Sequence, residues 1–175
     1  MQLLKTRTFL AVLLLIFACA ACGPKIIQGR PPFISIASLS MENERLKAVF
    51  TVSNQNGEPM EIRGIDIRVQ LEETELTQYN EDFSLTIDAN SAEDVTVEDL
   101  PDDFTRDLLA SLEQGDIISI PFELDGRVNT LGDGTLRFSN KGHLYPVPGR
   151  PGQFRSATTH SSRIDSDDPF KEVKN

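Results

Sequence analysis

The sequence predicts a mainly β protein, an antiparallel β-sandwich of about seven short strands with one short helix. Three observations lead to this fold class. Apolar and polar side chains alternate in several runs in the middle of the chain, as strands with one buried face require. Turn-forming residues separate these runs, and a single segment has apolar residues at helical spacing. With 175 residues, the chain is long enough for one domain with a hydrophobic core.

Residues 1–21 are typical of a lipoprotein signal peptide. Lys5 and Arg7 form a positive segment, and an apolar run from Phe9 to Phe17 follows it. A helix that crosses a bilayer needs about 20 apolar residues, so this run is too short to span one. We therefore expect the segment to be removed and to take no part in the fold.

The small residues after the apolar run predict a lipid anchor at Cys22. Ala20 and Ala21 precede this thiol, and a lipoprotein signal peptidase needs small side chains before the cut and a cysteine after it. A diacylglyceryl group with fatty acyl chains such as palmitate would be attached there. Cys19 is the rival acceptor, and an ordinary signal cut after Ala18 or Ala21 is the other alternative. A cut after Ala21 would leave a lone thiol in an oxidising compartment, which favours lipidation.

An anchor at Cys22 also limits the chemistry of the mature chain. No other cysteine would remain, which excludes a disulfide framework, a cysteine-based metal site and a cysteine nucleophile. Lipoproteins kept at the inner membrane resemble one another in having Asp after the lipidated cysteine, whereas this chain has Gly23. The expected location is therefore the outer membrane, lipid-anchored, with the domain facing the periplasm.

The charge balance excludes one class of partner. Loss of Lys5 and Arg7 leaves 15 basic residues against 27 acidic residues, a net charge of −12. Such a chain would be repelled by a phosphate backbone, so no nucleic-acid partner is expected. The same acidity argues against docking on anionic lipid and favours solubility.

The strand pattern begins after a tether over residues 22–32, which Gly29, Pro31 and Pro32 punctuate. Alternation then predicts strands within residues 33–39, 46–52, 65–71, 83–87, 95–97, 118–124 and 136–138. It is clearest in 65–71, where Ile, Ile, Val and Leu alternate with Asp, Arg and Gln. Pro121 predicts an edge strand or a bulge for its run, because proline cannot donate to a ladder.

Turns are predicted at three places between the strands. They are the segment from Asn54 to Pro59, the pair Asp125-Gly126, and residues 132–134. Asparagine tolerates the left-handed conformation and bonds its own backbone, so Asn54 and Asn56 with Gly57 are expected to form a structural turn.

The one predicted helix begins at Pro101-Asp102-Asp103 and ends at Gly115. A capping carboxylate lies near the positive end of its dipole. Its apolar residues at helical spacing are Phe104, Leu108, Leu109 and Leu112. We expect them to pack against the sandwich.

Composition changes near residue 146. Residues 146–175 are dominated by Pro, Gly, Ser, Thr, Arg and Asp, with few large apolar side chains. Such a segment buries too little surface to offset the entropy of ordering. The sequence therefore predicts a domain over residues 33–145 and a disordered tail over 146–175.

The order of features resembles the WHy domain, the water-stress and hypersensitive-response module of late-embryogenesis-abundant type 2 proteins. The matching segments are Pro32 to Ile36, Phe50 to Asn56, Pro59 to Val69 and Ile120 to Gly126. Gln55 stands where the family's Asn-Pro-Asn motif has proline. The resemblance covers roughly 32–144, and it implies an immunoglobulin-like or fibronectin-III-like sandwich. It also implies a non-enzymatic protein associated with desiccation and water stress.

The sequence offers little that points to catalysis. His143 and His160 are the only histidines, and no spacing fits a metal site, a nucleophile or a phosphate loop. Residues 165–168 begin like a calcium loop, but Pro169 and Phe170 stand where the third ligand and the turn glycine should be. We expect no catalytic residue, no metal and no cofactor. The leading hypothesis is a stress-associated lipoprotein, and the alternative is an envelope adaptor that offers a strand edge or sandwich face to another envelope protein.

Overall fold

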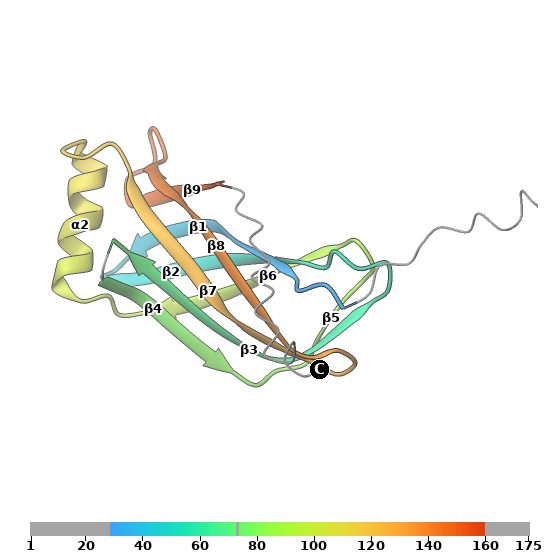
Figure 1. Cartoon of the computed structure of the whole chain (residues 1–175). Helices are drawn as coiled ribbons and strands as arrows, with labels where there is room; N and C mark the ends of the chain where they lie inside the picture. Colours follow the sequence, from blue (N-terminus) through green and yellow to red (C-terminus); the bar gives the residue numbers. More distant parts are fainter. Residues whose placement is uncertain (1–28, 73, 160–175) are drawn as a thin grey trace, which may run out of the picture.

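The computed structural model describes residues 29–72 and 74–159, which form a mainly β domain (Figure 1). Within these residues there are nine strands and one helix. In chain order they are β1 (Phe33–Glu42), β2 (Arg45–Ser53), β3 (Met60–Leu71), β4 (Thr74–Glu81), β5 (Leu85–Ile87), β6 (Ala92–Asp99), α2 (Asp103–Gln114), β7 (Ile120–Thr130), β8 (Gly134–Pro146) and β9 (Gln153–Thr159). The predicted mainly β class with one helix is confirmed.

All strand pairs are antiparallel, and they form one hydrogen-bonded path in the order β4-β3-β7-β8-β9-β1-β2-β6. The short β5 pairs with β3 off this path. Two layers face each other, and β9 connects them because it pairs with both β8 and β1. The sheet is thus nearly closed into a barrel-like sandwich, whose two free edges are β4 and β6.

The hydrophobic core fills the space between the two layers. Strand β3 illustrates why, because Ile65, Ile67 and Val69 are buried while Asp66 and Arg68 point outward. The same alternation in β2 and β7 brings their apolar faces to the same interior. Burial of these alternating side chains is the main contribution to stability.

Two glycines allow neighbouring strands to approach closely, and both lie opposite an aromatic ring. A Cβ on Gly126 would lie 1.9 Å from the carbonyl oxygen of Asp66 and 2.8 Å from the ring of Phe138. A Cβ on Gly142 would lie 2.8 Å from the ring of Phe122. The prediction of a turn at Asp125-Gly126 is therefore wrong. Gly126 lies within β7, where its missing side chain lets a ring of the neighbouring strand fit.

Pro121 lies in an interior strand, not at an edge. It is the second residue of β7, which pairs with β3 and β8. Strand β3 ends at Leu71, and the carbonyl oxygen of Pro121 accepts a bond from the backbone N–H of Glu72, at 3.2 Å. Proline is tolerated here because it lies beside the start of the strand, where a ladder donor is not required.

The predicted disordered tail is wrong for residues 146–159. Strand β8 continues to Pro146, and β9 pairs six of its residues with β8. Phe154 is 2 % exposed, and its burial between β8 and β1 provides the apolar contact that ordering requires. The domain therefore extends at least to Thr159, beyond the predicted end at residue 145. Residues 160–175 lie outside the described part of the chain.

Helix α2 has the predicted bounds. The Asp102 carboxylate accepts a bond from the N–H of Thr105, at 2.8 Å, and the pKa of Asp102 is lowered by hydrogen bonding to the side chain and then to the backbone of Thr105. Gly115 ends the helix in the left-handed conformation at φ 82°. The helix buries Thr105, Leu109 and Leu112 against the sheet. Within residues 29–72 and 74–159, no helix is long and apolar enough to span a bilayer.

The domain has two distinct ends, because α2 connects β6 to β7 at one of them (Figure 1). We call this the helix end. The opposite end, the clamp end, contains the start of β1 and the connections 54–59, 88–91 and 131–133.

Candidate functional site

Asn54 lies at the centre of a polar cluster at the clamp end. It is 2 % exposed, and its side-chain amide donates to the carbonyl oxygens of Glu58, Ile87 and Asp88, at 2.8 to 3.1 Å. Its side-chain oxygen accepts a bond from the backbone N–H of Asn56, at 2.9 Å. The side chain therefore connects the β2–β3 loop to the β5–β6 loop.

Asn56 connects the same loop to the residues that precede β1. Its side-chain oxygen accepts from the backbone N–H of Arg30, and its amide donates to the carbonyl oxygen of Arg30, both at 3.0 Å. This reciprocal pair imitates a rung of a β-ladder. Asn56 is 4 % exposed, and its own carbonyl oxygen accepts from the N–H of Asn90, at 3.1 Å.

The cluster of Asn54, Asn56 and Arg30, which we call the clamp, fixes where the chain joins the domain. Neither asparagine has a positive φ, so the left-handed conformation expected at these positions is not what they provide. They act through side-chain hydrogen bonds to backbone groups of three separate segments of the chain. Gly57 lies exposed in the bend and also has no positive φ.

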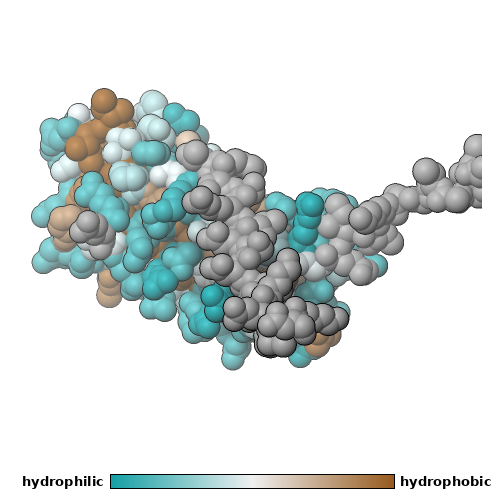
Figure 2. All heavy atoms as spheres, viewed as in Figure 1, coloured by the Kyte–Doolittle hydropathy of each residue, from teal (hydrophilic) through white to brown (hydrophobic). Residues whose placement is uncertain are grey.

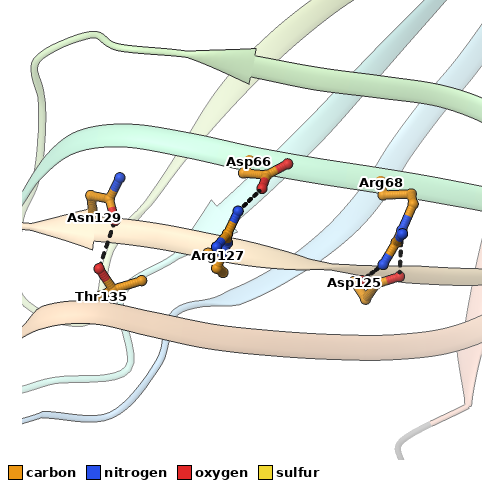
Figure 3. A network of polar contacts seen from close by, with 6 residues as sticks. All are labelled: Asp66, Arg68, Asp125, Arg127, Asn129 and Thr135. Carbon is orange, nitrogen blue, oxygen red and sulfur yellow. Dashed lines mark hydrogen bonds and ion pairs between the residues drawn. The ribbon is translucent and has the colours of Figure 1, made fainter.

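Charged side chains on the outer face of β3, β7 and β8 are mostly paired with one another (Figure 3). Arg127 bonds Asp66 at 2.7 Å, and Arg68 bonds Asp125 at 2.8 Å in the next row. The bond to Asp125 raises the pKa of Arg68. Exposed pairs of this kind contribute little to stability, and their mutual neutralisation gives the face no single-sign field for a charged ligand.

The two free edges meet near the helix end. The Thr77 hydroxyl of β4 donates to the Asp99 carboxylate of β6, at 2.6 Å, although the two strands share no ladder. On the same strand, burial and a bond to Glu81 raise the pKa of Tyr79 to about 12. We call the Thr77–Asp99 contact the clasp, because it bridges the two free edges of the sheet.

The described residues contain no cluster typical of a metal centre. In residues 29–72 and 74–159, no three His, Cys, Asp or Glu side chains gather closely enough to hold a metal ion. His143 lies beside Tyr145, with ring centroids 6.4 Å apart, and Arg155 lies over the Tyr145 ring at 5.5 Å. The predicted anchor Cys22, its rival Cys19, His160 and the acidic segment 165–168 lie outside the described residues.

No protein-family model matches the chain, and no curated protein matches its sequence. Solved structures with a similar trace include a crystal structure of a protein from Archaeoglobus fulgidus, 11 % identical with a TM-score of 0.44. That match covers 70 % of this chain and 98 % of the other. A solution structure of AT1g01470 from Arabidopsis thaliana is 15 % identical with a TM-score of 0.48, and the match covers 75 % and 93 % of the two chains.

Sequence reasoning missed two components of this arrangement. Nothing marked Arg30 as a partner of Asn56, because the contact uses only the backbone of Arg30. The clasp was missed because the strand β4 was not predicted. Its apolar residues Leu76 and Tyr79 lie three residues apart and do not alternate, because the register between β3 and β4 shifts between Thr77 and Glu75.

Proposed function

We propose that this protein is a non-enzymatic lipoprotein anchored through Cys22 in the outer membrane and associated with desiccation and water stress. The observation that supports it best is the clamp, which holds Arg30 firmly at one end of a β domain. Because Arg30 is held there, the chain that leads to the predicted anchor leaves the domain at the clamp end.

The chain length between anchor and clamp sets a geometry for this proposal. Arg30 lies eight positions after Cys22, a distance that spans at most about 28 Å when the chain is fully extended. Strand β8 has 13 residues, and a strand of that length measures about 43 Å. The clamp end would therefore lie near the membrane, and the helix end would point into the periplasm.

The first experiment tests the anchor. Intact mass of membrane-extracted protein should show acylation for the wild type and for Cys19→Ser, and none for Cys22→Ser. Sucrose-gradient separation should place the wild type with outer-membrane vesicles. Normal acylation of Cys22→Ser would show that the anchor has been assigned to the wrong cysteine, and a wild-type protein free of membranes would overturn the proposal.

A second experiment tests the stress role separately. A deletion strain should survive drying less well than its parent, and the wild-type gene should restore survival. Cys22→Ser should fail to restore it if the anchored form is the active one. Equal survival of the deletion strain and its parent would refute the stress association, whatever the state of the anchor.

One observation favours the second candidate function, an envelope adaptor. Leu100, Phe104 and Ile118 are 67 %, 51 % and 85 % exposed, and all three lie at the helix end. Leu100 and Phe104 lie at the start of α2 and Ile118 follows its end, so a partner that lies along the helix could contact all three. In a deletion strain, a mislocalised envelope complex with normal survival of drying would favour this function over the first.

A further inference from the structure

The exposed apolar residues of the helix end are not needed by the core. Helix α2 packs on the sheet through Thr105, Leu109 and Leu112. Phe104 lies one helical turn before Leu108, which is partly buried against the core, yet Phe104 itself is half exposed. Figure 2 shows hydrophobic residues on the surface at the α2 end of the domain.

These side chains have an acidic surrounding. Between residues 98 and 118 the sequence has seven Asp and Glu residues, and Arg106 is its single basic residue. Arg106 pairs with Asp103. The neighbouring loops contribute Arg45, which pairs with Glu98 at 3.8 Å, and Arg150. The field of this surface therefore stays negative and attracts a cationic partner.

The helix dipole strengthens that field beside Ile118. The C-terminal end of a helix carries a partial negative charge, which basic side chains usually offset. The last turn of α2 has no basic residue; Glu113 lies in it, and Asp116 follows the C-cap residue Gly115. Glu113 accepts a bond from the backbone N–H of Gly152, at 3.1 Å, which offsets only part of its charge. A lysine or arginine supplied by a partner would be stabilised at this point.

The free strand edges are poorer docking sites. Strand β6 carries Glu93, Asp94 and Glu98, and charged side chains on an edge strand oppose the addition of another strand. Its end is also occupied by the clasp with Thr77. The surface beside α2 combines exposed apolar groups with a negative field, and it therefore suits a partner better than the edges do.

We propose that Leu100, Phe104 and Ile118, which we call the helix-end patch, dock an amphipathic segment of another envelope protein that is rich in lysine and arginine. This inference rests on the proposed location in the periplasm. Helix α2 has 12 residues and is about 18 Å long, so a segment of about three helical turns would match it. Its apolar side chains would cover the patch, and its cations would face Glu113, Asp116 and the acidic first turn.

The test is site-specific photocrosslinking of the full-length protein in living cells. A benzoyl-phenylalanine side chain replaces Phe104 or Ile118 in turn. The matched control carries it in place of Leu131, which is 57 % exposed at the clamp end. The two helix-end positions should crosslink to the same protein, and peptide mapping should place the crosslink in a segment that alternates apolar residues with Lys and Arg. The Leu131 position should give at most about a tenth of that yield.

Charge is tested in the same cells. Glu113→Gln with Asp116→Asn should lower the crosslinking yield at position 118 about tenfold, whereas Glu58→Gln with Glu93→Gln at the clamp end should not change it. A crosslinked segment that is acidic or uncharged, a crosslink to a second copy of this chain or to lipid, or equal yield at all three positions would overturn the proposal. Membrane fractionation of the same cells shows independently whether the protein is anchored. A loss of crosslinking because the anchor proposal is wrong can therefore be distinguished from the absence of a partner.

Discussion

Replacement of Asn54 by aspartate should destabilise the domain severely at neutral pH. The change is nearly isosteric, so the packing is kept. The amide that donates to the carbonyl oxygens of Glu58, Ile87 and Asp88 becomes an oxygen that faces all three. The site is 2 % exposed, so the carboxylate can lose its repulsion only by binding a proton.

The size of the effect can be worked out in two parts. Loss of one amide donor at a buried site costs about 1–3 kcal/mol, even when the acid is protonated. Ionisation adds about 1.4 kcal/mol for each unit by which burial raises the pKa of the introduced carboxyl group above about 3.9, its value in the unfolded chain. A rise of about two units gives a total near 4–6 kcal/mol at pH 7, which is comparable to the whole stability of many domains.

The sign of the pH dependence follows from linkage. Between the unfolded and the folded pKa, the folded variant binds more protons than the unfolded chain, so its stability falls as pH rises. The penalty should be smallest below pH 4 and constant above the folded pKa. The free energy of unfolding of the wild type should not show this additional decrease over the same pH range.

Urea unfolding followed by circular dichroism measures the effect, because the chain has no tryptophan for fluorescence. The matched control is Asn80→Asp, the same chemical change on an exposed residue of β4, which should cost less than about 0.5 kcal/mol. Equal urea midpoints for wild type and Asn54→Asp at pH 7 would refute the structural role assigned to this amide. A penalty that does not vary with pH would refute its electrostatic explanation.

Three further substitutions test other parts of the fold by the same unfolding assay. Glu44→Gly should stabilise the domain by about 0.5–1 kcal/mol, because Glu44 has φ 65° in the β1–β2 turn; a loss of stability would contradict this reading of the turn. Gly126→Ala should cost about 3 kcal/mol or more, since its Cβ would overlap a backbone oxygen, while Gly132→Ala, with nothing within 4 Å, should be nearly neutral; equal costs would disprove the close approach. Thr77→Val should cost about 1–2 kcal/mol by removing the bond to Asp99, and an unchanged midpoint would show that the clasp does not hold the edges.

The parts of the fold that the sequence predicted correctly are those where one periodicity dominates. Strand β3 alternates without interruption over residues 65–71, and α2 has a capping aspartate, a helical apolar face and a terminal glycine. Both signals are local, so neighbouring residues alone suffice to read them. Strand β9 has one large apolar residue, Phe154, and is stabilised by its position between two partners. No local pattern carries that information.

The errors at Gly126 and Pro121 have one physical origin. Glycine and proline usually mark turns or edges, since they weaken regular strands. Here the neighbouring strands approach closely, and Gly126 lacks the side chain that would collide with the Asp66 carbonyl oxygen and the Phe138 ring. Pro121 lies beyond the last residue pair of the β3–β7 ladder. The N–H group that proline lacks is therefore not needed for that ladder. Tertiary geometry therefore places both residues within an interior strand, although they usually mark turns or edges.

Closure of this barrel depends on polar bridges rather than on covalent links. Cys19 and Cys22 are the only cysteines of the chain, so the domain from Arg30 onward contains none. Where the ladders are interrupted, single side chains cross the gap: Asn140 bonds the carbonyl oxygen of Ile34 at 3.2 Å, and Ser156 bonds that of Ile36 at 2.6 Å. The clamp and the clasp do the same elsewhere.

These bridges bear on the proposed role in water stress. The hydrophobic contribution to stability requires surrounding water, whereas water competes with every internal hydrogen bond. As water activity falls, the apolar core loses part of its driving force, and each buried polar bridge loses its competitor and strengthens. A sandwich closed at the clamp, the clasp and the Asn140 and Ser156 bridges would therefore keep its layers together under the conditions that weaken its core.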